Sequence, residues 1–383
     1  MERGLYDEDH EAFRAVVRTF VKREVEPCLQ KWEEERLVDR ALWRAASRQG
    51  LIGLAVPEEY GGGGQGDIRF RAVMMEELAA VGAASVQLGI SLTEDIAMPY
   101  FLELATAQQK RRWLPGLAAG ELISAIAMTE PDAGSDLRGM RTTAVRDGDH
   151  WLINGAKTFI TNGFQADVVI VAARTDPAAG SHGISLFVVE AGTPGFSRGR
   201  KLEKIGLHGQ DTAELFFHDA RVPVDHLLGQ EGSGLRHLME RLPRERLSIA
   251  MGAQAAAEAA FAWTLDYVKQ RKAFGRPVAA FQSTAFTLAE LRTALDVSQA
   301  YLDRAMLALN GGTLTAQDAA KAKWWATDLQ HRVTDRGVQL HGGYGYMTEY
   351  PIARAFVDSR VQSIYGGTNE IMKEIISRQL IDG

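Results

Sequence analysis

The sequence predicts an α+β protein of three consecutive domains. These are an N-terminal helical domain (1–121), a middle antiparallel β-barrel-like domain (122–231) and a C-terminal four-helix-bundle-like domain (232–383). Near both ends of the chain, apolar residues recur every three or four positions, as on the buried face of a helix. Between them, short β-branched and aromatic runs are separated by Gly, Asn, Asp or Pro. Because no long helical stretch separates those runs, the middle part is not an alternating β-α-β unit.

The first domain opens with a helical pattern over Asp7–Glu35. We expect one buried stripe, formed by Phe13, Val16, Val17, Phe20 and Val21. The run Tyr60–Asp67 predicts a loop, because its four consecutive glycines cannot hold a helix. Helical patterns resume over Ile68–Val81 and Ser85–Leu104. Pro115 then separates this region from the segment that leads into the middle domain.

Five runs predict the strands of the middle domain. Each is short, β-branched or aromatic, and bounded by turn-forming residues. They are ISAIAMT (123–129), WLING (151–155), DVVIVAAR (167–174), GISLFVVE (183–190) and AELFFHDA (213–220).

The third domain is helical again. Leu235–Arg271 is Ala-rich and periodic, and Phe281–Asn310 and Thr315–Leu340 follow it. The pair Gly311-Gly312 breaks the last two helices apart, since consecutive glycines destabilise a helix interior.

Composition bounds the class of protein. A hydrophobic content of 46% with 24% charged residues is ordinary for a globular chain. The net charge of −6, with Lys and Arg scattered, argues against nucleic-acid binding. The single cysteine, Cys28, excludes an intrachain disulfide and fits a reducing compartment. With no apolar stretch for a signal peptide or a membrane span, we expect a cytoplasmic protein, and we expect no metal ion.

Two predicted strands end in loops suited to the polar parts of a ligand. MTEPDAGSD (Met128–Asp136) presents the hydroxyls of Thr129 and Ser135 together with backbone N–H groups. KTFITNG (Lys157–Gly163) ends in small polar residues and carries the hydroxyl of Thr161. The first stretch alone is equally compatible with an ordinary turn, and the second alone favours an ordinary strand end.

Two further motifs lie in the helical C-terminal domain. QRKAFGRPV (Gln270–Val278) concentrates Arg271, Lys272 and Arg276 at a helix end. Cations there favour the helix dipole, but arginines also bind a pyrophosphate in bidentate fashion. QLHGGYGY (Gln339–Tyr346) runs from a helix into glycines that let the backbone approach a cofactor. Taken alone, neither motif decides between a structural role and a cofactor-binding role.

The fifth motif is IYGGTNE, Ile364–Glu370. Gly366 and Gly367 can bring the backbone close to a substrate, but they carry no chemical group. In this order, the five motifs resemble those of the acyl-CoA dehydrogenase flavoproteins over roughly residues 5–380, most closely the long-chain branch. The resemblance implies FAD as cofactor, an acyl-CoA thioester as substrate and an electron-transfer flavoprotein as electron acceptor.

The resemblance also implies which residues hold the cofactor. In the same subunit they would be Ile126, Met128, Thr129, Gly134, Ser135, Phe159, Ile160, Thr161, Thr368, Asn369 and Glu370. The FAD of a neighbouring subunit would be contacted by Arg271, Gln282, Gln339, Leu340, His341, Gly342 and Gly343, and Phe274 is a further cofactor contact. Many members have Trp where this chain has Phe159. A shared cofactor implies at least a dimer, and the family is typically a homotetramer, a dimer of dimers.

The substrate contacts implied by the resemblance are Ser135, Pro243, Arg246, Gly366 and Gly367. The implied reaction is α,β-dehydrogenation to a trans-2-enoyl-CoA in fatty-acid β-oxidation. In it, a base removes the α-proton while the β-hydride passes to the flavin N5. Many members carry the base at the position of Gly366, so this chain needs another. The backbone amide of Gly366 would still bind the thioester oxygen.

In the long-chain and isovaleryl branches the base comes from an earlier helix. The matching segment here, HLMERLPRERLSIA (237–250), identifies Glu245 as the base. Pro243 marks a helix start or kink. From the residues alone, Glu245 between two arginines favours a solvated helix face or an ion pair, and only the resemblance favours the base. Glu240, the nearest competitor, lies about 140° around the helix, so the two carboxylates cannot face one pocket.

Other functions on this fold stay open. An acyl-CoA oxidase would pass electrons to oxygen, a biosynthetic desaturase would act on a carrier-protein thioester, and a flavin-free scaffold would only bind. The branch resemblance favours a long or branched acyl group. Arg236, however, places a charge near the acyl site where an aromatic residue is expected.

Overall fold

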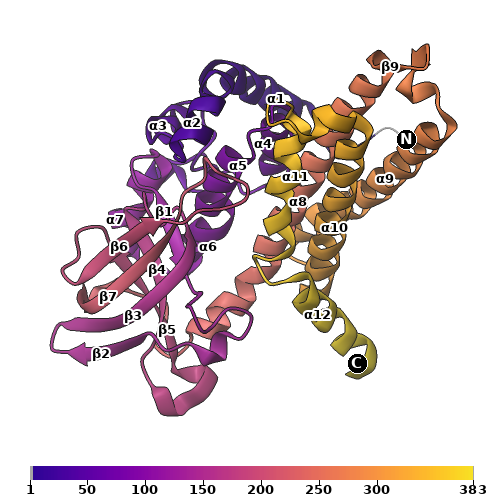
Figure 1. The fold of residues 1–383 in the computed structure, drawn as a ribbon. Helices are drawn as coiled ribbons and strands as arrows, with labels where there is room; N and C mark the ends of the chain where they lie inside the picture. The colour runs from indigo at the N-terminus through magenta and orange to yellow at the C-terminus, as the bar shows by residue number, and fades with distance from the viewer. Residues whose placement is uncertain (1–2, 383) are drawn as a thin grey trace.

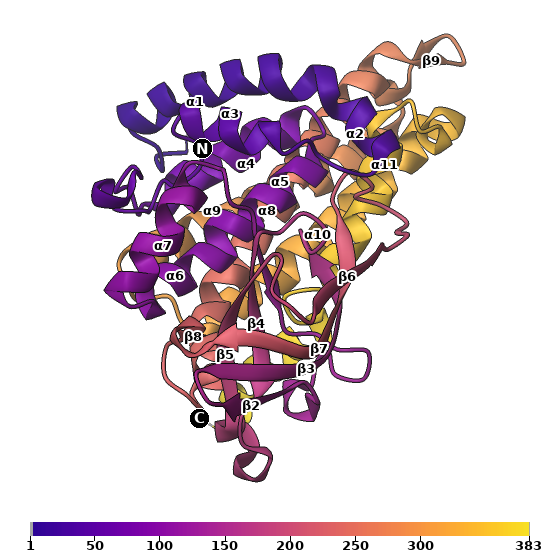
Figure 2. The same cartoon turned by 90° about the vertical axis from the view of Figure 1, so that its left-hand side faces the viewer.

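The structure, a computed structural model, describes residues 3–382. Its elements follow the predicted order of helices, then strands, then helices (Figure 1). The strands of the large sheet lie together at one end of the molecule and the first N-terminal helices at the other, whereas the short hairpin of the C-terminal part lies away from the sheet (Figure 2). Within residues 3–382, no helix combines the length and the apolar character needed to cross a bilayer.

Seven α-helices form the N-terminal part of the described chain. They are α1 (Glu8–Phe20), α2 (Leu29–Glu35), α3 (Ala41–Arg48), α4 (Ile68–Ala80), α5 (Ala84–Ser91), α6 (Met98–Leu104) and α7 (Ala107–Ala118). The single helix expected over 7–35 is interrupted by a π-helical turn, Val21–Val25, and a 3₁₀ turn that contains Pro27. Proline has no N–H to continue an α-helix. Val16 is 41% exposed, so the prediction that it belongs to the buried stripe was wrong.

Helix α7 contains Pro115, which was expected to interrupt the chain. Thr106 and Gln109 form a capping box at its start, a signal that could have identified it. A proline in the last turn removes only one helical hydrogen bond. Between α5 and α6 the chain forms a second π-helical turn, Leu92–Ala97, whose Asp95 is buried.

The middle part is one eight-stranded sheet in the order β6-β7-β3-β2-β4-β5-β8, with β1 beside β4. The strands are β1 (Ser124–Ala127), β2 (Thr143–Asp147), β3 (His150–Thr161), β4 (Val168–Arg174), β5 (Ile184–Glu190), β6 (Phe196–Lys201), β7 (Thr212–Pro223) and β8 (Leu227–Leu228). All five predicted runs contain strands. The sheet is not purely antiparallel, because β1 pairs with β4 in parallel. After β1 the chain forms β2 and β3 before β4 returns beside β1, and this crossover lets β4 run in the same direction as β1.

Five α-helices and a small hairpin form the C-terminal part. They are α8 (Gly234–Gln270), α9 (Gln282–Asn310), α10 (Ala316–His341), α11 (Pro351–Ser359) and α12 (Asn369–Asp382), with β9 (Lys272–Ala273) and β10 (Arg276–Pro277) between α8 and α9. Helices α8, α9 and α10 lie side by side, and α11 and α12 pack against α10 (Figure 1). Pro243 lies inside α8, so it does not start the helix as was thought possible.

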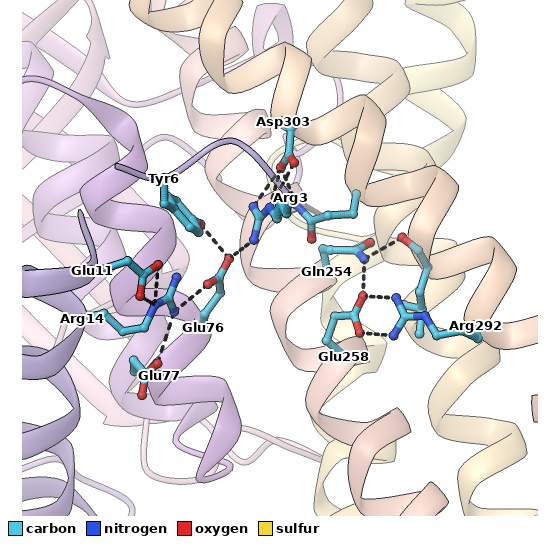
Figure 3. A network of polar contacts seen from close by, with 12 residues as sticks. Arg3, Tyr6, Glu11, Arg14, Glu76, Glu77, Gln254, Glu258, Arg292 and Asp303 are labelled. Atoms are coloured by element: carbon cyan, nitrogen blue, oxygen red, sulfur yellow. Dashed lines mark hydrogen bonds and ion pairs between the residues drawn. The ribbon is translucent and has the colours of Figure 1, made fainter. Parts of the chain in front are cut away.

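A polar network joins the two helical parts (Figure 3). Arg3 pairs with Glu76 on α4 at 2.6 Å and with Asp303 on α9 at 2.8 Å. Arg292 on α9 pairs with Glu258 on α8 at 2.7 Å. Helix α8 also packs against α4 through a shared apolar core. The long helix α8 therefore has fixed neighbours along its length.

Candidate active site

The Gly366-Gly367 turn lies just before α12 and is held from two helices. Both glycines have positive φ angles, 63° and 91°, which residues with a Cβ rarely adopt. Arg246 Nε on α8 donates to the Gly366 carbonyl at 3.4 Å, and Lys323 Nζ on α10 donates to the Gly367 carbonyl at 2.8 Å. A Cβ on Gly366 would lie 2.3 Å from Ile249 Cδ1. Both the backbone and its surroundings therefore favour glycine.

Glu245 is buried on α8, with only 4% of its surface exposed. Burial raises its carboxyl pKa to about 7, although the hydrogen bond from Tyr100 and the charge of Arg246 oppose this rise. The Tyr100 hydroxyl on α6 donates to Glu245 Oε1 at 2.9 Å. Glu240, by contrast, has a side chain that is 51% exposed and lies 3.9 Å from Arg236. The two carboxylates occupy different faces of α8, as their spacing predicted.

Helix α8 contacts the glycine turn through residues that follow Glu245 in the chain. Arg246, the next residue after Glu245, contacts the Gly366 carbonyl, and Ile249 one turn later packs against Gly366. A buried carboxyl whose pKa is about 7 thus lies on the helix segment that holds the side-chain-free turn. This arrangement can accept a proton from a substrate that lies against the turn.

The predicted cofactor loops lie side by side in the sheet. Lys157 Nζ donates to the Met128 carbonyl at 3.0 Å and pairs with Glu130 at 2.9 Å. The Thr158 N–H donates to the Thr129 carbonyl at 3.0 Å. These contacts fix the loop after β1 against the end of β3. Sequence reasoning missed Glu130 and Lys157, because their pairing depends on the fold.

Phe159 is an exposed aromatic residue at an irregular point of β3. Its φ is 59° and 68% of its surface is exposed, next to a register shift in the β3–β7 pairing. Thr129 and Thr161 are half-buried, and Ser135 is exposed on the loop. Met128 is half-buried and Gly134 exposed, whereas Ile126 and Ile160 belong to the hydrophobic core. An exposed ring beside hydroxyl donors fits a planar heteroaromatic group such as a flavin.

A second group of predicted residues lines a groove of about 590 Å³ on the C-terminal helices. The groove brings together Arg271 and Gln339–Gly343, and its other lining residues are Tyr267, Val278, Tyr344 and Met347. Phe274 is 96% exposed at the tip of the β9–β10 hairpin, and Gln282 is exposed at the start of α9. Neither residue lines the groove.

The last predicted cofactor residues begin α12. Asn369 is buried and its side chain is bonded to Thr327 and Lys323, so it stabilises the turn. The Thr368 hydroxyl accepts from the Ile371 N–H at 3.3 Å, and Glu370 is exposed. The pKa of the Lys323 ammonium is lowered to about 7, mainly by burial. Pro243 is half-buried in α8.

Three family models cover nearly the whole chain. Those of the acyl-CoA dehydrogenase N-terminal, middle and C-terminal domains match residues 7–121, 125–220 and 232–381. The chain belongs to the acyl-CoA dehydrogenase family. It is therefore an enzyme of the oxidoreductase class with the α+β fold of this family, as the sequence predicted.

Individual relatives agree with this family. The mitochondrial long-chain specific acyl-CoA dehydrogenase of Sus scrofa is 50% identical, with 99% of this chain and 88% of the relative covered. The crystal structure of an acyl-CoA dehydrogenase from Geobacillus kaustophilus superposes with a TM-score of 0.97 at 49% identity, covering 99% of this chain and 100% of that one. A glutaryl-CoA dehydrogenase from Mycobacterium smegmatis, solved in complex with FADH2, has a TM-score of 0.92 at 29% identity, covering 99% and 96%.

Proposed function

We propose that the chain catalyses FAD-dependent α,β-dehydrogenation of an acyl-CoA thioester to the trans-2-enoyl-CoA in fatty-acid β-oxidation, with Glu245 as the base. The observation that carries this proposal is the buried Glu245 carboxyl, whose pKa is about 7, on the helix segment that supports Gly366. The relationship to long-chain specific enzymes supports a long acyl substrate.

The chemistry requires a base of this kind. An α-proton beside a thioester is weakly acidic, so a carboxylate with an ordinary pKa near 4.3 is too weak a base at neutral pH. Glu245 combines a raised pKa with a fixed position on α8. When bound, FAD supplies the hydride acceptor.

Gly366 would stabilise the charge that develops on the thioester oxygen. A preorganised backbone N–H can do this without a side chain. The contacts from Arg246 and Lys323 to the Gly366 and Gly367 carbonyls support this role, because they hold the two peptide groups that directly follow the Gly366 N–H. Ser135 and Pro243, together with Gly367, would complete the acyl-CoA contacts.

The cofactor residues fit FAD in two groups. Thr129, Ser135 and Thr161 would donate to the flavin of the same subunit, with Phe159 beside the ring. The groove at Arg271 and Gln339–Gly343 would hold the FAD of a neighbouring subunit, since a guanidinium and glycine amides suit a pyrophosphate. This shared binding supports a homotetramer assembled as a dimer of dimers.

The decisive variant is Glu245→Gln. We expect flavin reduction by an acyl-CoA, followed anaerobically as bleaching, to be at least about a thousandfold slower than in the parent, because no carboxylate accepts the α-proton. Glu240→Gln is the matched control, an exposed glutamate on the same helix, and should reduce its flavin normally. Parent-rate reduction in Glu245→Gln would refute the assignment.

Three further assays examine the remaining parts of the proposal. Electron-transfer flavoprotein should accept the electrons, and rapid peroxide formation in air would indicate an oxidase instead. Carrier-protein thioesters tested beside CoA thioesters would expose a biosynthetic desaturase. The cytoplasmic location rests on the sequence, and cell fractionation with an antibody against the chain examines it.

A further inference from the structure

Tyr100 contacts the proposed base from a different helix. It lies on α6, directly after the π-helical turn Leu92–Ala97, and it is 0% exposed. Its hydroxyl donates to Glu245 Oε1 at 2.9 Å. The proposed reaction and the family resemblance gave this tyrosine no role.

The ring of Tyr100 is held in place from α8. The Arg241 guanidinium lies 5.2 Å from the ring centroid, within the range of a cation–π contact. The same guanidinium pairs with Glu103 on α6 at 2.7 Å and donates to the His237 carbonyl at 2.9 Å. Arg241 therefore joins α8 to α6 across the Tyr100 ring. The phenol cannot swing away without breaking these contacts.

The two oxygens of Glu245 are not equivalent. Oε1 accepts the Tyr100 hydroxyl, whereas Oε2 accepts no hydrogen bond from any residue in the described range 3–382. Although Oε2 has no partner within that range, it is not completely buried and keeps a small accessible surface. A carboxylate held by one oxygen presents the other for proton transfer.

We propose that Tyr100 is a positioning residue that holds the Glu245 carboxylate through Oε1 so that Oε2 faces the substrate α-carbon. The proposal rests on the proposed function, in which Glu245 is the base. The phenol stays a donor, since burial and the neighbouring carboxylate raise the pKa of Tyr100 well above its ordinary value of 10.

The hydrogen bond also favours the ionised form of the base. A donor to a carboxylate stabilises the charged state more than the neutral one. The charged groups closest to this pair are Arg241 and Arg246 on α8 and Glu103 on α6, and further out lie Arg71 on α4, Asp95 in the π-helical turn and Lys323 on α10. Asp95 is paired with Arg71 at 2.8 Å and also accepts from Ser248. A Tyr100→Phe substitution alters none of these groups.

The test is Tyr100→Phe in the FAD-loaded enzyme, which keeps the ring and removes only the hydroxyl. We expect the acid limb of the pH profile of flavin reduction to move up by about one to two pH units. At pH 7 the rate should fall about tenfold, with KM nearly unchanged, and it should recover at alkaline pH. Difference infrared spectroscopy should show the Glu245 carboxyl band, assigned by its loss in Glu245→Gln, titrating at the same higher pH.

Tyr6→Phe is the matched control, because the Tyr6 hydroxyl donates to Glu76 Oε1 at 2.7 Å, a similar bond away from Glu245. It should leave the pH profile unchanged. Should Tyr100→Phe fold poorly, 3-fluorotyrosine at position 100 tests the same bond, since a more acidic phenol should move the acid limb to lower pH. An unchanged profile and an unchanged band in either Tyr100 variant, with Glu245→Gln inactive, overturns this inference and leaves the proposed function standing. Full activity in Glu245→Gln overturns both.

Discussion

Replacing Glu245 with Gln should make the protein more stable while it abolishes activity. The ionised carboxylate is costly because Glu245 is buried. Glutamine has nearly the same shape, carries no charge, and keeps a carbonyl oxygen that accepts the Tyr100 hydroxyl. Its NH2 group takes the place of Oε2, the oxygen that no residue in the described range 3–382 bonds.

The magnitude follows from the pKa of the carboxyl. Burial raises this pKa from its ordinary value of 4.5 to about 7. At about 1.4 kcal/mol per pKa unit, the ionised native state is disfavoured by about 3 kcal/mol. Between those two pKa values the native state holds a proton that the unfolded state has released, so the stability of the parent falls as pH rises. Glutamine does not titrate, and the variant escapes this loss.

The assay is urea unfolding of parent and variant at several pH values, at fixed protein concentration and with saturating FAD. The gain in unfolding free energy should be about 3 kcal/mol at pH 8.5 and below about 1 kcal/mol at pH 5. Glu240→Gln should show no pH-dependent gain, because its side chain is half exposed. A Glu245→Gln gain that is the same at both pH values, or a loss at pH 8.5, would refute the reasoning.

Lys157→Met should destabilise the protein by about 3 kcal/mol and reduce the FAD retained on gel filtration, because the buried Glu130 carboxylate loses its ion-pair partner and keeps only the Arg141 and Thr142 N–H donors. Unchanged stability would contradict this. Gly366→Ala should lower the free energy of unfolding, measured in urea, by about 1–2 kcal/mol from its positive φ alone, and by more because of the clash with Ile249. In an Ile249→Ala background, which removes the clash, the same substitution should cost only the part due to φ. Phe274→Ala should change subunit stability by less than about 0.5 kcal/mol, because the ring is exposed, yet weaken assembly in sedimentation experiments. Full assembly would show that the ring lies outside the subunit contact.

Local patterns predicted the long helices well. The Ala-rich periodicity placed α8 within one residue at each end, because the apolar face of a helix can be recognised from neighbouring residues in the sequence. The strands β1, β4 and β5 were equally clear from their apolar runs. Pro115 was misleading, since a proline tolerated inside a helix has the same sequence signature as one that ends it.

Contacts between distant segments could not be predicted. The parallel pairing of β1 with β4 depends on the crossover through β2 and β3. The contact of Tyr100 with Glu245 joins two helices far apart in the chain. The residues around Glu245 favoured an ion pair on a solvated helix face, because two arginines flank it, and only the family resemblance pointed to a catalytic carboxylate. Only the packing of α8 against its neighbours distinguishes these alternatives.

The π-helical turn Leu92–Ala97 has a consequence for how this family can diversify. Each π-type hydrogen bond accommodates one residue more than an α-helical one. Deleting one residue there would restore an α-helical turn and leave the residues that follow in nearly the same orientation, because the π-turn absorbs the extra residue locally. Tyr100 would then still face α8 without any compensating substitution. This segment can thus gain or lose one residue without displacing the side chain that contacts Glu245.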